Sequence, residues 1–232
     1  MRRDERPLAS LPVWLWLALA AALAAQIGFR ALHSATKLHE ADLPPPPSAS
    51  ALRLAGLGER AAAARLAMLY LQAFEYRKLD YQRLVEWLHN ILELDPRSQY
   101  PLFAAARVYA ETPDAARARL VLDFIYREFL VDPGRRWPWL AHAALLAKHR
   151  LKDLPLARRY AAALDRHTQA ADLPLWARQM ELFILEDMNE LEAARIMLGG
   201  LLASGAIQDP AEARFLAGRL KSLEERMRRE RR

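Results

Sequence analysis

Cysteine is absent from the 232 residues of this chain. Its absence excludes disulfide bonds, metal sites with thiolate ligands and a catalytic thiol. Glycine is scarce, with only 8 residues, whereas hydrophobic residues make up 53% of the sequence and alanine and leucine are prominent. Because Ala and Leu lose little free energy on entering a helix, this composition favours an all-α protein.

A basic stripe on the body of the protein is also missing. The net charge is +6, but residues 1–58 carry +2 and residues 219–232 carry +4, so residues 59–218 are neutral overall. Nucleic-acid-binding domains normally concentrate Lys and Arg on their folded surface. We therefore expect no nucleic-acid partner.

Charged residues are missing from Pro7 to Phe29, a run of 23 residues. At about 1.5 Å per residue, a helix of this length crosses a hydrocarbon core of roughly 30 Å. Trp14 and Trp16 lie near its start, and indole rings favour the lipid headgroup region. The sequence therefore predicts a membrane anchor at residues 1–32, with a transmembrane helix at about residues 8–29.

The same segment has a second interpretation as a cleaved signal peptide, because Ala22-Leu23-Ala24 has the small-x-small form of a cleavage site. Three arginines precede the run, and Arg30 and Lys37 follow it. The positive-inside rule then slightly favours a cytoplasmic N-terminus and a single-pass protein with its bulk outside. A repeat domain on the cytoplasmic face is the alternative.

Residues 33–58 read as a proline-rich linker. The four consecutive prolines from Pro44 to Pro47 cannot occupy a helix interior and prefer the extended polyproline form. Such a segment acts as a semi-rigid spacer. Recognition by a proline-binding domain is the alternative.

Further prolines punctuate the rest of the chain at regular intervals. Pro101, Pro138, Pro174 and Pro210 are spaced 37, 36 and 36 residues apart, and an apolar helix-like run follows each of the first three. A period of this length is typical of a solenoid whose unit is two helices. We therefore predict an α-helical repeat domain at residues 59–232 that ends in a capping helix at 210–229.

Helix boundaries follow from the same punctuation. Asp80 is expected to cap one helix, and Asp95-Pro96 to end it, because the residue before proline avoids the α region. The small residues Ala116, Ala157 and Ala194 align in successive second helices and predict close helix contacts there. The helices are expected at about residues 59–77, 81–94, 101–109, 114–130, 138–151, 154–164, 174–188, 190–204 and 210–229.

These helix pairs, with their small packing residues and the closing sequence Leu92-Glu93-Leu94-Asp95-Pro96, resemble the tetratricopeptide repeat and its relatives over about residues 59–205. The chain is divergent, since its period exceeds 34 residues and the consensus of the first helices is missing. With its expected anchor and linker, it also resembles bacterial membrane-anchored repeat proteins that are uncharacterised. The resemblance implies an antiparallel helix-pair solenoid that acts as a scaffold. Together with the charge bias around the anchor, it leads us to expect a single-pass protein of the bacterial inner membrane with its repeat domain in the periplasm.

The densest aromatic and basic cluster lies at the start of the third repeat. Aromatic residues and arginine are enriched at interaction hot spots. Packing between repeats is the alternative role for the two tryptophans. The predicted partner-binding residues are Arg135, Arg136, Trp137, Trp139, His142, Lys148 and His149.

No arrangement of residues in the sequence indicates catalysis. His142 and His149 are seven residues apart, so a helix separates them by about 10 Å, too far for one metal ion. We expect no enzyme, no cofactor and no metal site. The predicted function is a membrane-anchored scaffold or assembly factor that binds protein partners of the cell envelope. The alternative is a regulatory or accessory subunit of a membrane-associated enzyme or transporter.

Overall fold

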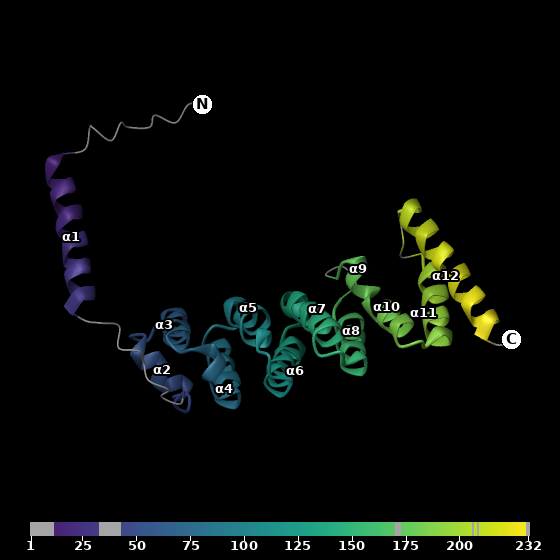
Figure 1. The fold of residues 1–232 in the computed structure, drawn as a ribbon, viewed down its shortest axis with the longest axis horizontal. Coiled ribbons are helices and arrows are strands. Elements are labelled where there is room, and N and C mark those ends of the chain that lie inside the picture. Colours follow the sequence, from purple (N-terminus) through teal and green to yellow (C-terminus); the bar gives the residue numbers. More distant parts are fainter. Residues whose placement is uncertain (1–11, 33–42, 170–172, 206, 208, 231–232) are drawn as a thin grey trace. The chain divides into compact units, whose positions relative to one another are not determined.

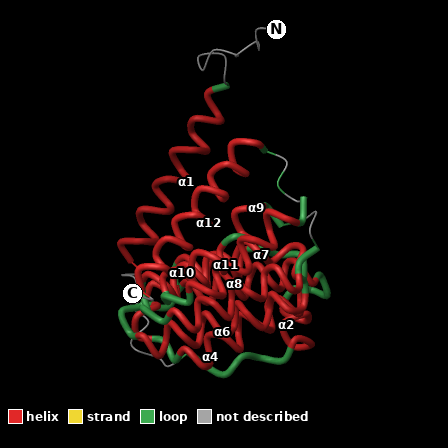
Figure 2. Tube along the Cα trace, turned by 90° about the vertical axis from the view of Figure 1, so that its right-hand side faces the viewer, coloured by secondary structure: helices red, strands yellow, loops and turns green. Residues whose placement is uncertain are grey.

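The chain divides into two compact units, residues 1–41 and 42–232. The first contains the helix α1, Val13–Leu32 (Figure 1). All the described residues are in helices, turns or irregular segments and none is in a strand (Figure 2), which confirms the all-α prediction. The computed structural model describes residues 12–32, 43–169, 173–205, 207 and 209–230.

Helix α1 does not match the predicted transmembrane span of residues 8–29. Among the described residues, no helix is both long and apolar enough to cross a membrane. The helix begins only at Val13 and has Arg30 near its end. The structure therefore does not support the span, whose residues 8–11 lie outside the described part.

The second unit is a succession of short helices joined by tight turns. Two of the turns contain a single 3₁₀ turn, at Tyr76–Lys78 and Tyr109–Glu111. Its α-helices are α2 (Ala49–Ala55), α3 (Arg60–Gln72), α4 (Tyr81–Leu94), α5 (Tyr100–Arg107), α6 (Ala115–Val131), α7 (Pro133–His149), α8 (Leu154–His167), α9 (Leu175–Arg178), α10 (Met180–Asp187), α11 (Leu191–Ala203) and α12 (Pro210–Glu230).

Neighbouring helices of this unit pack in pairs. Helix α3 contacts α4, α5 contacts α6, α7 contacts α8, and α10 contacts α11, against which α12 packs. Contacts also run between successive pairs, from α4 to α6 and from α5 to α7. The result is a first layer of α3, α5, α7 and α9 and a second layer of α4, α6 and α8 (Figure 1).

Aspartate side chains begin the second helix of several pairs. Asp80 accepts hydrogen bonds from the backbone N–H groups of α4, as the sequence predicts, and Asp114 and Asp153 do the same for α6 and α8. These bonds satisfy N–H groups that have no partner inside the helix. Each aspartate therefore fixes the point at which the chain turns back on itself.

Two of the predicted helices differ from the structure, one in its start and one in its continuity. Helix α7 begins at Pro133, and Pro138 lies inside it. Pro138 has no N–H to bond the carbonyl of Gly134, so α7 continues past it with this backbone bond missing. The helix expected at residues 174–188 is instead broken into α9 and α10 at Gln179.

Within the second unit, the proline-rich segment packs against helix α4, whereas the sequence predicted a linker through residue 58. Leu43 is fully buried in the core, and Ser48 caps α2. Carbonyl groups of a polyproline segment have no backbone partner, so side chains can bind them. Helix α4 supplies these donors: Arg83 Nη1 to Leu43 O (2.8 Å), Trp87 Nε1 to Pro44 O (2.8 Å) and Asn90 Nδ2 to Pro47 O (3.1 Å). We call residues 43–47 the strap. Residues 33–42 of the predicted linker lie outside the described residues.

The core of the second unit consists of two clusters of buried side chains. The larger one runs from Leu43 to Ile184 and is rich in leucine and alanine. The smaller one joins α10, α11 and α12, and its buried members are Leu182, Leu185, Leu191, Ala194, Leu198, Leu216 and Leu223. Helix α12 thus covers the end of the repeats, as expected of a capping helix.

Candidate functional site

Exposed aromatic side chains gather on the first layer of helices. Phe103 is 42% exposed and Trp176 is 53% exposed, although both are large and apolar. Trp137 and Trp139 are half-buried and pack against the edge of the larger core cluster. We call the following six residues the aromatic face: Tyr70 of α3, Tyr100 and Phe103 of α5, Trp137 and Trp139 of α7, and Trp176 of α9.

Contacts between rings connect this face from one repeat to the next. The Phe103 ring meets Tyr100 at a centroid distance of 6.0 Å and Trp139 at 5.9 Å. On the other side of α7, Trp137 meets Trp176 edge to face at 5.8 Å. Edge-to-face and offset contacts are the favourable arrangements of aromatic rings. The rings therefore hold one another in place while leaving part of their surface open.

Polar contacts orient the same rings. Gln72 Nε2 of α3 donates a hydrogen bond to Tyr100 Oη at 2.7 Å, and Trp139 Nε1 donates one to Gln99 Oε1. Both bonds join neighbouring repeats, so the face is ordered before any partner binds. Preorganised rings lose little conformational entropy on binding.

Exposed leucines extend the apolar surface beyond the rings. Leu66 and Leu69 are exposed on α3, and Leu145 is exposed on α7. Single exposed apolar residues are common on soluble proteins, but contiguous apolar surface marks an interaction site. The aromatic face and these leucines occupy successive helices of one layer, and ring contacts join Phe103 to Trp139 and Trp137 to Trp176.

Basic side chains on the first layer differ in whether they have a partner. Arg135 pairs with Asp132, and Lys148 pairs with Asp187. Arg65 and Arg107 are exposed, and neither has an ion pair with another described residue. Of the predicted basic site residues, His149 is also exposed.

Arg136 lies in the interior, although the sequence placed it among the partner-binding residues. Only 2% of its surface is exposed. Its Nη1 donates to Glu128 Oε2 at 2.7 Å and to Glu128 O at 2.8 Å, and its Nη2 donates to Pro96 O at 3.2 Å. The carboxylate of Glu128 also accepts His89 Nδ1 at 2.7 Å. Arg136 therefore connects helices and is not available to a partner on the surface.

His142 sits between the interior and the exposed surface of α7. Burial and the nearby guanidinium of Arg107 lower the pKa of His142 below its ordinary value. Both effects disfavour a positive charge on the imidazole. His142 is therefore neutral at neutral pH and adds no positive charge next to Arg107.

Four members of the aromatic face were missed by sequence reasoning. These are Tyr70, Tyr100, Phe103 and Trp176, whereas Trp137 and Trp139 were predicted. Phe103 and Trp176 each follow a recurring proline by two residues. The same position after Pro138 is Leu140, which is fully buried, so this spacing gave only a partial signal.

Comparison with known proteins adds no assignment. No protein-family model, no curated protein and no solved structure matches the chain. The function is therefore inferred from the structure of the site.

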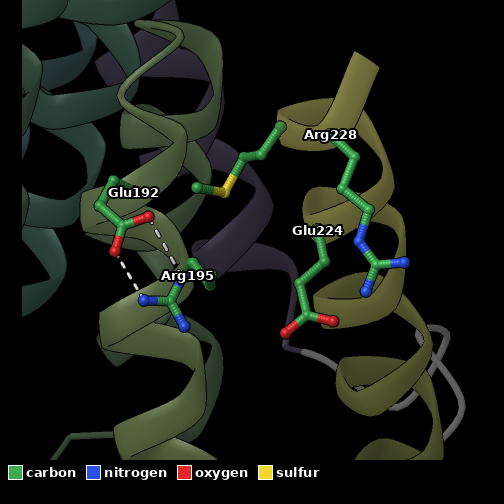
Figure 3. A pocket seen from close by; sticks show the side chains of 5 residues that line it. Glu192, Arg195, Glu224 and Arg228 are labelled. Carbon is green, nitrogen blue, oxygen red and sulfur yellow. Dashed lines mark hydrogen bonds and ion pairs between the residues drawn. The ribbon is translucent and has the colours of Figure 1, made fainter. Parts of the chain in front are cut away.

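A second candidate site is an open cavity of about 310 Å³ between α11 and α12 (Figure 3). Arg195 donates two hydrogen bonds to Glu192 there, at 2.6 and 3.2 Å. Glu224 and Arg228, one turn apart on α12, complete its charged lining. Its positive and negative groups balance, so it offers no excess charge to a ligand.

In the described part of the chain, no three His, Asp or Glu side chains are placed to hold a metal ion.

Proposed function

We propose that this protein is a non-catalytic scaffold of tetratricopeptide-like helix pairs that binds a partner protein through its aromatic face. The observation that carries this proposal is the continuity of exposed rings across α5, α7 and α9. Trp, Tyr and Phe are enriched at the centres of protein interfaces, where they bury much surface at low entropic cost.

The repeat architecture supports the same function. Helix-pair solenoids present the first helices of successive repeats on one extended surface, which suits a polypeptide ligand better than a small molecule. The pairs α3–α4, α5–α6 and α7–α8 follow this pattern, and five of the six rings lie on the first helices of these pairs, with Trp176 on the short helix α9. This binding function requires only helices of the second unit.

The test is an affinity isolation of the full-length chain from cells, quantified by mass spectrometry. One variant carries Phe103→Ser and Trp176→Ser. The control carries Leu120→Ser and Leu130→Ser on α6, whose side chains are 38% and 42% exposed and belong to the second layer. The control also removes two exposed apolar side chains, although leucines expose less area than these rings, so it tests whether the layer from which they are removed matters.

We expect a partner that is recovered by the natural chain and by the control, and lost with the Phe103→Ser/Trp176→Ser variant. Losing two hot-spot rings costs about 2 kcal/mol or more each, which is enough to release a micromolar partner. Equal recovery by all three proteins would refute the aromatic face as the binding site. A partner that proves to be an enzyme would make the chain its accessory subunit.

A further inference from the structure

We infer that the segment bound by the aromatic face is an acidic stretch of a partner protein, with Asp or Glu between apolar side chains. This inference rests on the proposed function and specifies the chemistry of its partner. The charged residues of the first layer indicate which kind of segment fits beside the rings.

The four helices of the first layer contain no acidic residue. Neither Asp nor Glu occurs in α3, α5, α7 or α9. The second layer differs, since its helices α4, α6 and α8 carry Glu86, Glu93, Asp123, Glu128 and Asp165. A surface built only from apolar, basic and neutral groups does not repel the carboxylates of a partner, and its unpaired arginines attract them.

Three carboxylates that border the first layer form ion pairs with basic side chains. Asp132 pairs with Arg135, and Asp187 pairs with Lys148. Glu111, in the 3₁₀ turn after α5, pairs with Arg150. Glu59 at the start of α3 is exposed and has no ion pair with another described residue, so the negative charge is reduced beside α5 and α7 rather than along the whole layer.

Two arginines of the same layer are left for a partner. Arg107 lies one helical turn from Phe103 on α5, so a carboxylate bound by Arg107 would sit beside the Phe103 ring. Arg65 lies one turn from Leu69 on α3 in the same way. Arg107 and Arg65 have no ion-pair partner among the described residues. This spacing fits a ligand in which acidic and apolar side chains are interspersed.

Nucleic acid fits this surface less well, although aromatic rings and arginines also bind single strands. A tight protein–nucleic acid complex neutralises about 6–10 phosphates. The first layer has only two arginines without an internal partner, and residues 59–218 are neutral overall. An acidic polypeptide needs far fewer cations and uses the rings for its apolar side chains.

The experiment places a photo-crosslinking amino acid at position 103 of the full-length chain in cells, with a control at position 130 on α6. The crosslinked segment is then identified by mass spectrometry. A synthetic peptide of that segment is compared with a version in which every Asp becomes Asn and every Glu becomes Gln. Binding of both peptides is measured with the purified full-length chain, with Arg107→Glu and with the control Arg127→Glu, an exposed arginine on α6.

We expect segments captured at position 103 to carry more Asp and Glu than Lys and Arg. The amide peptide and the Arg107→Glu variant should each bind about tenfold more weakly, whereas Arg127→Glu should bind as the natural chain. A captured segment without excess acid, or an amide peptide that binds equally well, would overturn this inference and leave the proposed function intact. A nucleic acid captured at position 103, or no protein captured there above the control, would overturn both.

Discussion

Arg136 and Glu128 illustrate how single residues connect the repeats. The Arg136 guanidinium on α7 donates hydrogen bonds to the Glu128 carboxylate on α6 and to the carbonyl of Pro96, which follows α4 in the chain. One side chain therefore joins three segments. Both ionised groups are nearly fully buried. A buried pair of this kind contributes little net stability over an apolar pair, but losing one partner leaves a charge without compensation.

We therefore predict that Arg136→Met lowers the free energy of unfolding by about 3–5 kcal/mol, because the Glu128 carboxylate stays buried. The double variant Arg136→Met/Glu128→Met should recover most of this loss. Urea unfolding followed by circular dichroism measures both. A single Arg136→Met variant within about 1 kcal/mol of the natural chain would show that the pair is not buried as described.

His142 gives the protein a predictable sensitivity to acid. The pKa of His142 in the folded chain lies below its ordinary value of 6.5, because of burial and of Arg107. In the unfolded chain the imidazole takes up its proton near 6.5, whereas in the folded chain it does so only at lower pH. The unfolded state then binds more protons, so the His142 contribution destabilises the fold as the pH falls below 6.5.

His142→Gln should consequently reduce the loss of stability between neutral and mildly acidic pH, because glutamine does not titrate. The measurement is the urea midpoint of the full-length chain at the two pH values. The matched control is His149→Gln, on the same helix and exposed, which shows whether the effect is specific to the half-buried histidine. Identical pH dependence of the natural chain and His142→Gln would contradict the prediction.

At the scale of elements, the strap shows that a proline-rich segment need not be a spacer. Its carbonyls accept hydrogen bonds from three side chains of α4, and Leu43 enters the core next to them. The strap covers the first repeat at one end, as α12 covers the last repeat at the other. The ends of a solenoid need such covers because their outer surfaces lack a neighbouring repeat.

Leu43→Ala should therefore lower the free energy of unfolding by about 2–5 kcal/mol, since it leaves a cavity in the core. Leu54→Ala is the matched control: Leu54 is 78% exposed on α2, so its loss should be within about 0.5 kcal/mol. Chemical unfolding of both variants gives the comparison. Equal effects of the two substitutions would show that the strap is not docked.

Sequence reasoning predicted the helix pairs, the Asp80 cap and the capping helix, because periodicity and caps act locally. It aligned Ala116 with Ala157 and Ala194, but the alanine that is buried in α6 is Ala118. The caps explain the difference: Ala118, Ala157 and Ala194 each follow their N-cap residue by four positions. The alignment of repeats predicted from the sequence was therefore shifted by two residues in one repeat.

The candidate site was predictable only in part, because its geometry depends on contacts between repeats. Trp137 and Trp139 stood out through their local density, but their ring partners Trp176 and Phe103 lie about one repeat away. Arg136 was placed on the surface because nothing in the sequence indicated its pairing with Glu128. Both errors concern distances that only the packed helices determine.

At the scale of the whole molecule, the two core clusters indicate that the second unit does not unfold as one block. Helices α11 and α12 rely on the smaller cluster, and Arg219 of α12 bonds the buried carboxylate of Glu186 in α10. The stability of repeat proteins is roughly a sum of local terms, so regions with separate cores can open separately.

Leu216→Ala should accordingly speed hydrogen exchange in α11 and α12 while leaving α4 to α7 unchanged, because Leu216 is fully buried in the smaller cluster. The local loss is expected to be about 2–5 kcal/mol. Hydrogen exchange with mass spectrometry resolves the two regions. A uniform increase of exchange over the whole unit would indicate a single cooperative core instead.

If partner proteins bind the aromatic face, they must cover the first layer of helices. We would measure hydrogen exchange of the full-length chain, alone and saturated with the partner recovered by affinity isolation. We expect slower exchange in α5 and α7, around Phe103 and Trp139, with no change in α6. Protection of α6 or of the cavity between α11 and α12, without protection of α5 and α7, would contradict binding at this face.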